Sequence, residues 1–181
     1  MKTTILLRAA IAALATCALS TAVSAQPKKA SPTDQAVLLG QFGDWGAYKA
    51  TPGGKKVCFA LSKPTKATTE PAGRNRDPGY AFVSTRPAEK VKNEVSVIVG
   101  YPQKGGHDAT ATVGTANYVL YTQNDGAWVK NAAEEAQMVE TMRKGSDLVV
   151  KSESSRGTKT TDTYSLKGIA QALDKVTEEC K

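Results

Sequence analysis

Alternation of side-chain character along short runs is the feature that most constrains the fold of this chain. From Gln41 onward these runs are rich in Val, Thr and Tyr, and Gly, Asn and Asp separate them. The pattern is typical of β-strands joined by turns. We expect a mainly β fold, an antiparallel β-sandwich or open barrel of about 7–8 strands. The runs lie at 42–48, 55–62, 80–86, 93–101, 116–122, 126–130, 146–153 and 158–165.

Two segments have helical patterns instead. Residues 131–145 begin with Asn131 as an N-cap, carry acidic residues early and basic residues late, and end at Gly145, which predicts a short surface helix. A C-terminal helix is predicted over 165–180, with Ser165 as its cap. Its apolar residues are spaced three, four, three and four apart and therefore share one face: Leu166, Ile169, Leu173, Val176 and Cys180.

The start of the chain has the pattern of a secretory signal peptide over residues 1–25. Two basic residues precede an apolar run over 9–19, and small residues lead to a predicted cleavage after Ala25. A membrane anchor is the weaker alternative, because the apolar run is shorter than the ~20 residues of a spanning helix. A lipoprotein would need Cys17 as its first mature residue, and Thr16 fits poorly before it. No later stretch predicts a membrane span.

Removal of the signal peptide leaves two cysteines, Cys58 and Cys180. In an oxidising compartment they have one intramolecular pairing, so we predict a disulfide between them. A zinc site is not expected, because no C-x-x-C occurs and His107 is the single histidine. The disulfide would place the last helix over the small side chains of the strand at 55–62. The large side chains of that strand would enter the sandwich core: Val57, Phe59 and Leu61.

Residues 26–39 are predicted to be a flexible leader, and 40–181 a single domain. Within the domain, 62–79 has three prolines and no large apolar residue, which predicts a long loop. Such a loop is either an ordinary solvated segment or a functional one. Basic residues in and after it suggest a patch for anionic glycans, phospholipid head groups or an acidic protein: Lys63, Lys66, Arg74, Arg76, Arg86, Lys90 and Lys92.

The charge and the residue types argue against several function classes. Without Lys2 and Arg8, the 24 lysines and arginines fall to 22 against 17 acidic residues, a modest net charge of +5. An exported chain of this charge, without a recognition motif, is not expected to bind nucleic acid. A catalytic triad would have to use His107, which we assign to a surface loop. No phosphate-binding glycine motif occurs, and no cofactor is predicted.

Paired carboxylates for glycoside hydrolysis are the remaining catalytic possibility. Four aspartates that we assign to turns could supply them, but nothing in the sequence selects two: Asp44, Asp77, Asp125 and Asp162. Aspartate is frequent in turns for local hydrogen-bonding reasons. We therefore predict no catalytic, cofactor-binding or metal-binding residues.

The residues from Gln41 to Lys181 resemble the invasion-associated locus B family of alphaproteobacterial exported proteins. The resemblance is most specific from Asp125 onward, and the family's cysteine pattern matches Cys58 and Cys180. It implies a periplasmic protein, or one that is secreted or associated with the outer membrane. In pathogens the family is associated with host-cell invasion, and it supplies no catalytic residues. We expect a non-enzymatic protein that binds an envelope or host-surface component, for example an anionic one. The alternatives are an enzyme or inhibitor acting on envelope polymers and a stress or chaperone-like factor.

Overall fold

The structure, a computed structural model, describes residues 35–181. The predicted signal peptide, Cys17 and most of the predicted leader lie outside these residues. No helix in the described part is long and apolar enough to cross a membrane.

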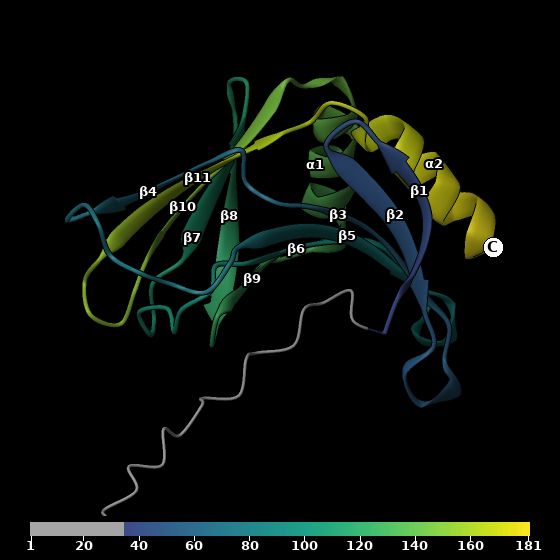
Figure 1. The fold of residues 1–181 in the computed structure, drawn as a ribbon, viewed down its shortest axis with the longest axis horizontal. Helices are drawn as coiled ribbons and strands as arrows, with labels where there is room; N and C mark the ends of the chain where they lie inside the picture. The colour runs from purple at the N-terminus through teal and green to yellow at the C-terminus, as the bar shows by residue number, and fades with distance from the viewer. Residues whose placement is uncertain (1–34) are drawn as a thin grey trace, which may run out of the picture. The chain divides into compact units, whose positions relative to one another are not determined.

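Eleven strands form one antiparallel sheet in the order β1-β2-β3-β5-β6-β9-β8-β7-β10-β11-β4. This confirms a mainly β, antiparallel and open architecture, with more strands than the predicted 7–8. Figure 1 shows β4, β11, β10, β7 and β8 on the left of the fold, β1 and β2 on the right, and β9, β6, β5 and β3 between them. The strands are β1 Val37–Phe42, β2 Trp45–Ala50, β3 Val57–Ser62, β4 Lys66–Glu70, β5 Tyr80–Arg86, β6 Val91–Ile98, β7 Ala109–Val113, β8 Ala116–Gln123, β9 Gly126–Val129, β10 Asp147–Glu153 and β11 Lys159–Ser165.

Three strands were not predicted. β1 begins at Val37, so the sheet starts inside the segment that we assigned to the leader. β4, with the sequence KATTE, lies inside the predicted loop at 62–79 and pairs with β11 at the sheet edge. β7, ATATV, is short and contains only small or β-branched side chains. Weakly apolar strands of this kind depend on their neighbours more than on their own sequence.

One face of the sheet is apolar along almost its full width. The register places Ala47, Ala60, Val83 and Val95 opposite one another across β2, β3, β5 and β6. The same face continues through Leu120 and Val150 on the other side of the fold, and all of these side chains are buried. We call this side the inner face. It forms the hydrophobic core together with the helices.

Two helices cover the inner face. In α1, Ala132–Lys144, the Asn131 side chain accepts a hydrogen bond of 2.9 Å from the Glu134 backbone N–H, which confirms the predicted N-cap. The N-cap of α2, Ile169–Glu179, is Gly168 and not the predicted Ser165, which ends β11. Gly168 has a φ of 92°, and a Cβ there would lie 1.9 Å from the Phe42 carbonyl oxygen. Two short 3-10 helices complete the fold, Pro52–Gly54 and Pro87–Glu89.

The predicted disulfide between Cys58 and Cys180 is present, with a Cα–Cα distance of 6.0 Å. It lies where α2 packs on β2 and β3, and the predicted apolar face of the helix is buried there. Ala60 and Ser62 also lie on the helix side of β3, as expected from their size.

The large side chains of β3 do not enter a sandwich core, because no second sheet covers their face in residues 35–181. They lie on the outer face, where the Phe59 ring stacks on Tyr48 at 5.4 Å and contacts Phe82 at 5.8 Å. Phe59 is only 7% exposed and Leu61 6% exposed. Neighbouring aromatic side chains on the same face therefore bury them in place of a second sheet.

Candidate functional site

The segment 71–79 crosses the inner face from the sheet edge to its centre. It leaves β4, which lies at the edge beside β11, and enters β5, which pairs with β3 and β6. The Asp77 backbone N–H donates to the Gly100 carbonyl at 3.1 Å, just after β6. A Cβ on Gly100, whose φ is 78°, would lie 2.0 Å from the Asp77 carbonyl oxygen. Glycine is thus required where this crossing segment contacts the end of β6.

A buried ion pair fixes the crossing segment to β11. Arg76 Nη1 donates to Asp162 Oδ2 at 2.8 Å, and Arg76 Nη2 donates to Asp162 Oδ1. Nη1 also donates to the Val99 carbonyl at 2.7 Å. The Asp162 side chain is 1% exposed and that of Arg76 is 11% exposed. Burial alone would lower the pKa of Arg76, but the hydrogen bonds and the charge of Asp162 raise this pKa above its ordinary value.

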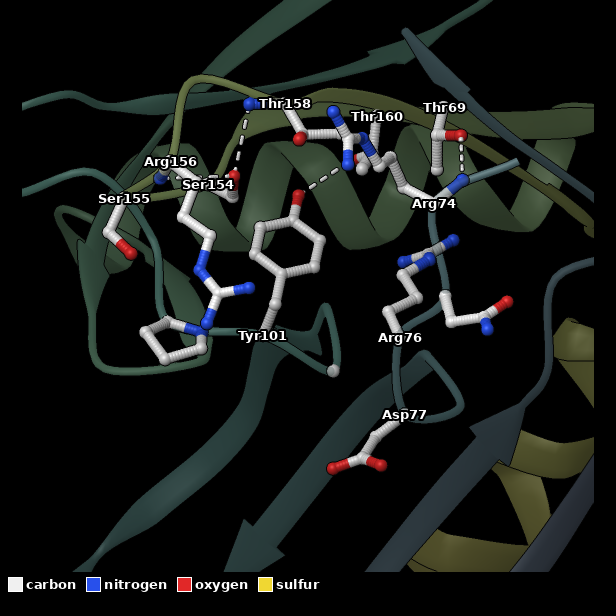
Figure 2. A pocket seen from close by; sticks show the side chains of 13 residues that line it. Thr69, Arg74, Arg76, Asp77, Tyr101, Ser154, Ser155, Arg156, Thr158 and Thr160 are labelled. Atoms are coloured by element: carbon white, nitrogen blue, oxygen red, sulfur yellow. Dashed lines mark hydrogen bonds between the residues drawn. The ribbon is translucent and has the colours of Figure 1, made fainter. Parts of the chain in front are cut away.

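A cleft of about 600 Å³ lies between the crossing segment and the turn that joins β10 to β11. The Tyr101 side chain lies within it, and its hydroxyl is hydrogen-bonded to Thr160 Oγ1 at 2.5 Å. Figure 2 shows Arg156 on one side of the Tyr101 ring and Arg74 on the other. Because the two arginines come from segments about 80 residues apart in sequence, the fold and not a local motif brings them together. We call this site the arginine cleft.

Hydrogen bonds from backbone N–H groups to side-chain hydroxyls fix the backbone at both arginines at the rim of the arginine cleft. The Arg74 N–H donates to Thr69 Oγ1 at 3.2 Å, which ties the crossing segment to β4. Ser154 Oγ accepts from the N–H groups of Arg156 at 3.3 Å and Thr158 at 3.0 Å, which closes the β10–β11 turn. Both arginines are exposed, and neither makes an ion pair within residues 35–181.

This arrangement can bind an anionic group. A guanidinium presents its N–H donors in a planar fork that matches carboxylate, phosphate or sulfate oxygens. Threonine, serine and tyrosine hydroxyls supply further hydrogen-bonding groups around the arginine cleft. Asp77 is the one carboxylate among the described residues that line it.

The structure divides the predicted basic patch between the two ends of β5. Arg86 ends β5, whereas the crossing segment joins its start. At the ordinary rise per residue of a strand, the two are about 20 Å apart. It forms ion pairs with Glu94 at 2.9 Å and Glu89 at 2.7 Å, and these hydrogen bonds, that of Glu94 first, raise its pKa. Lys90 and Lys92 lie at the same end, near Cys180. These three residues are not part of the arginine cleft.

The other predicted patch residues lie near the crossing segment but differ in what they can do. Arg74 lines the arginine cleft, whereas Arg76 is neutralised by Asp162. Lys63 lies 5.8 Å from the centre of the Tyr80 ring and lines a second, adjoining cavity. Lys66 pairs with Thr163 in register, which places it on the outer face, away from both cavities.

Sequence reasoning missed Arg156, Tyr101 and Thr160. Arg156 has the one local signal that could have been used, a lone arginine in the polar turn SESSRG between two strands.

The assignment of Asp162 to a turn was wrong, because it lies in β11 and pairs in register with Val150. His107 lies on an exposed loop, as expected, with its Nδ1 3.2 Å from the Gly105 carbonyl. Residues 35–181 contain no cluster of His, Cys, Asp and Glu suited to a metal ion.

Comparisons with known proteins agree with the resemblance drawn from the sequence. The family model described as invasion associated locus B (IalB) protein matches residues 45–177. The crystal structure of invasion associated protein B from Bartonella henselae matches with a TM-score of 0.50 and 15% identity, over 77% of this chain and 95% of that chain. At this identity the structural likeness bears on the fold alone. A search of curated proteins returned no match. The family model covers most of the chain, and the chain therefore belongs to the invasion associated locus B family.

Proposed function

We propose that this protein is exported and acts by binding, without catalysis, to an envelope or host-surface component that carries an anionic group. The arginine cleft is its binding site. The observation that carries the proposal is the pair Arg74 and Arg156, two exposed guanidinium groups that share one cleft and have no carboxylate partner of their own in residues 35–181.

Other features support the two parts of the proposal. The signal-peptide pattern and the Cys58–Cys180 disulfide both suit an oxidising compartment outside the cytoplasm. The groups that line the arginine cleft are guanidinium, hydroxyl and amide groups with one carboxylate, and no histidine or cysteine is among them. Such a set recognises charge and hydrogen-bonding pattern, and it contains neither a pair of carboxylates nor a histidine or cysteine for nucleophilic catalysis.

The test is capture of envelope components by the mature, oxidised protein, compared with capture by Arg74→Gln/Arg156→Gln. The matched control is Lys90→Gln/Lys92→Gln, which removes the same charge at the far end of β5. We expect the first variant to lose most of its capture at about 0.05 M salt, and wild type to lose it as salt rises. Equal capture by the two double variants would refute the arginine cleft as the binding site.

A chaperone-like role is the second candidate, because large apolar side chains are exposed. Val37 is 58% exposed, Leu38 52%, Val119 46% and Tyr121 41%. Exposed apolar patches bind other apolar surfaces. Suppression of the aggregation of an unfolded client by wild type and by Arg74→Gln/Arg156→Gln alike would favour this role over anion binding.

A further inference from the structure

The arginine cleft adjoins another cavity across the crossing segment. A second cavity of about 670 Å³ lies on the other side of the crossing segment and is formed with the β3–β4 connection and β4. The two cavities share Thr69 and residues 74–77 as lining. An elongated ligand that passes over the crossing segment would reach both cavities, whereas a single small ion would fill only a fraction of either one.

Cationic side chains are distributed along this path. Of these two cavities, Arg156 lines the arginine cleft, Lys63 lines the second, and Arg74 lines both. Arg76 also lines both, but its charge is balanced by Asp162. Three cations without a carboxylate partner in residues 35–181, placed at the two ends and the middle, match a chain with repeated negative charges better than a ligand with one.

The remaining lining favours a saccharide over a lipid or a peptide. Hydroxyl groups of Thr69 and Thr158 and the amide of Asn75 both donate and accept hydrogen bonds, as sugar hydroxyls do. Apolar side chains in the second cavity are small or are prolines, such as Ala67 and Pro64. They offer little surface to bury an acyl chain or the large side chains that anchor a peptide.

We propose that the two cavities form one groove that binds an extended anionic polysaccharide. Arg156 and Arg74 contact one charged sugar unit in the arginine cleft, and Lys63 contacts a charged unit farther along the chain. This inference rests on the proposed function, because it names the ligand class of the same site.

The experiment measures affinity for heparin-derived oligosaccharides of two to eight sugar units, which carry both carboxylate and sulfate groups. We expect affinity to rise at least about tenfold from the disaccharide to the hexasaccharide, because a second contact becomes intramolecular once the chain spans the groove. Lys63→Gln should weaken hexasaccharide binding about fivefold and leave disaccharide binding unchanged. Arg156→Gln should weaken both. Lys90→Gln is the matched control and should weaken neither.

The outcomes separate this inference from the proposed function. Affinity that does not depend on length, but still falls in Arg74→Gln/Arg156→Gln, overturns the groove and leaves anion binding in the arginine cleft. Binding of poly-glutamate as tight as that of the octasaccharide overturns the polysaccharide class, and so does the absence of binding to every oligosaccharide. Length-dependent binding that is unchanged when Arg74 or Arg156 is replaced overturns both the groove and the arginine cleft as the binding site. An unchanged thermal midpoint of each variant shows that a lost contact, and not unfolding, causes the change.

Discussion

The two ends of the inner face are tied by different means. At one end the Cys58–Cys180 disulfide joins segments 122 residues apart and holds α2 over β3. At the other, the Arg76–Asp162 ion pair joins segments 86 residues apart and holds the crossing segment against β11. A disulfide acts chiefly on the unfolded chain, by restricting it. A buried ion pair must recover the cost of removing two charges from water, so it depends on every hydrogen bond around it. The candidate site lies at the end with the ion pair.

The largest effect is expected from loss of the disulfide. In Cys58→Ser/Cys180→Ser, the free energy of unfolding should fall by about 4–5 kcal/mol, because a loop of 122 residues is no longer closed in the unfolded state. Urea denaturation of the variant and of wild type, with and without reductant, measures this difference. Reduced wild type should match the variant. A difference below about 1 kcal/mol would show that the buried face of α2 holds the helix without the disulfide.

Loss of one partner of the ion pair should have the next largest effect. Asp162→Asn leaves the guanidinium of Arg76 partly buried without its counter-charge, which should cost about 3 kcal/mol of unfolding free energy. Arg76→Met/Asp162→Leu removes both charges and should recover much of that loss. The double variant should nevertheless bind anions poorly, because the crossing segment that carries Arg74 has lost its attachment to β11. Full stability of Asp162→Asn in urea would contradict a structural role for the pair.

The same two ties show what the sequence could and could not reveal. Two cysteines remain once a signal peptide is removed, so the sequence alone allowed one intramolecular disulfide, and the spacing from Leu166 to Cys180 placed it on a helix face. Arg76 and Asp162 had many possible partners among the other charged residues. Their pairing depends on β4 lying beside β11, and the polar sequence KATTE gives no sign of that. The arginine cleft was missed for the same reason, since Arg156 joins Arg74 only through this strand order.

Packing at the disulfide end is expected to contribute less than the covalent bond. Leu173→Ala removes a fully buried side chain from α2 and should lower the unfolding free energy of the oxidised protein by about 3 kcal/mol. Leu173→Met is the matched control, because it nearly conserves volume and should cost less than about 1.5 kcal/mol. If alanine and methionine had equal effects in urea denaturation, the helix would be held by the disulfide rather than by its buried face.

A single hydrogen bond between α1 and β6 is the weakest of these long-range ties and should have the smallest effect. Glu135 Oε1 accepts from the Val95 N–H at 2.8 Å. Burial raises the pKa of Glu135, and the hydrogen bond from Val95 opposes that rise only in part. The folded protein therefore holds this proton more tightly than the unfolded chain does. The contribution of Glu135 to stability must then fall as pH rises from the ordinary pKa of a glutamate through its raised pKa in the fold.

Glu135→Gln separates this hydrogen bond from the charge that burial penalises. The glutamine amide oxygen can still accept from Val95, so the variant should be more stable than wild type at pH 7, by at most a few tenths of a kcal/mol. Its advantage should shrink as pH falls below the ordinary glutamate pKa, where both side chains are neutral. Other carboxylates titrate over the same range, so the difference between variant and wild type in urea midpoint is the quantity to follow. A variant that is less stable at pH 7 would mean that the charged form of Glu135 is favoured here, and a difference that does not change with pH would mean that folding leaves the Glu135 pKa unshifted.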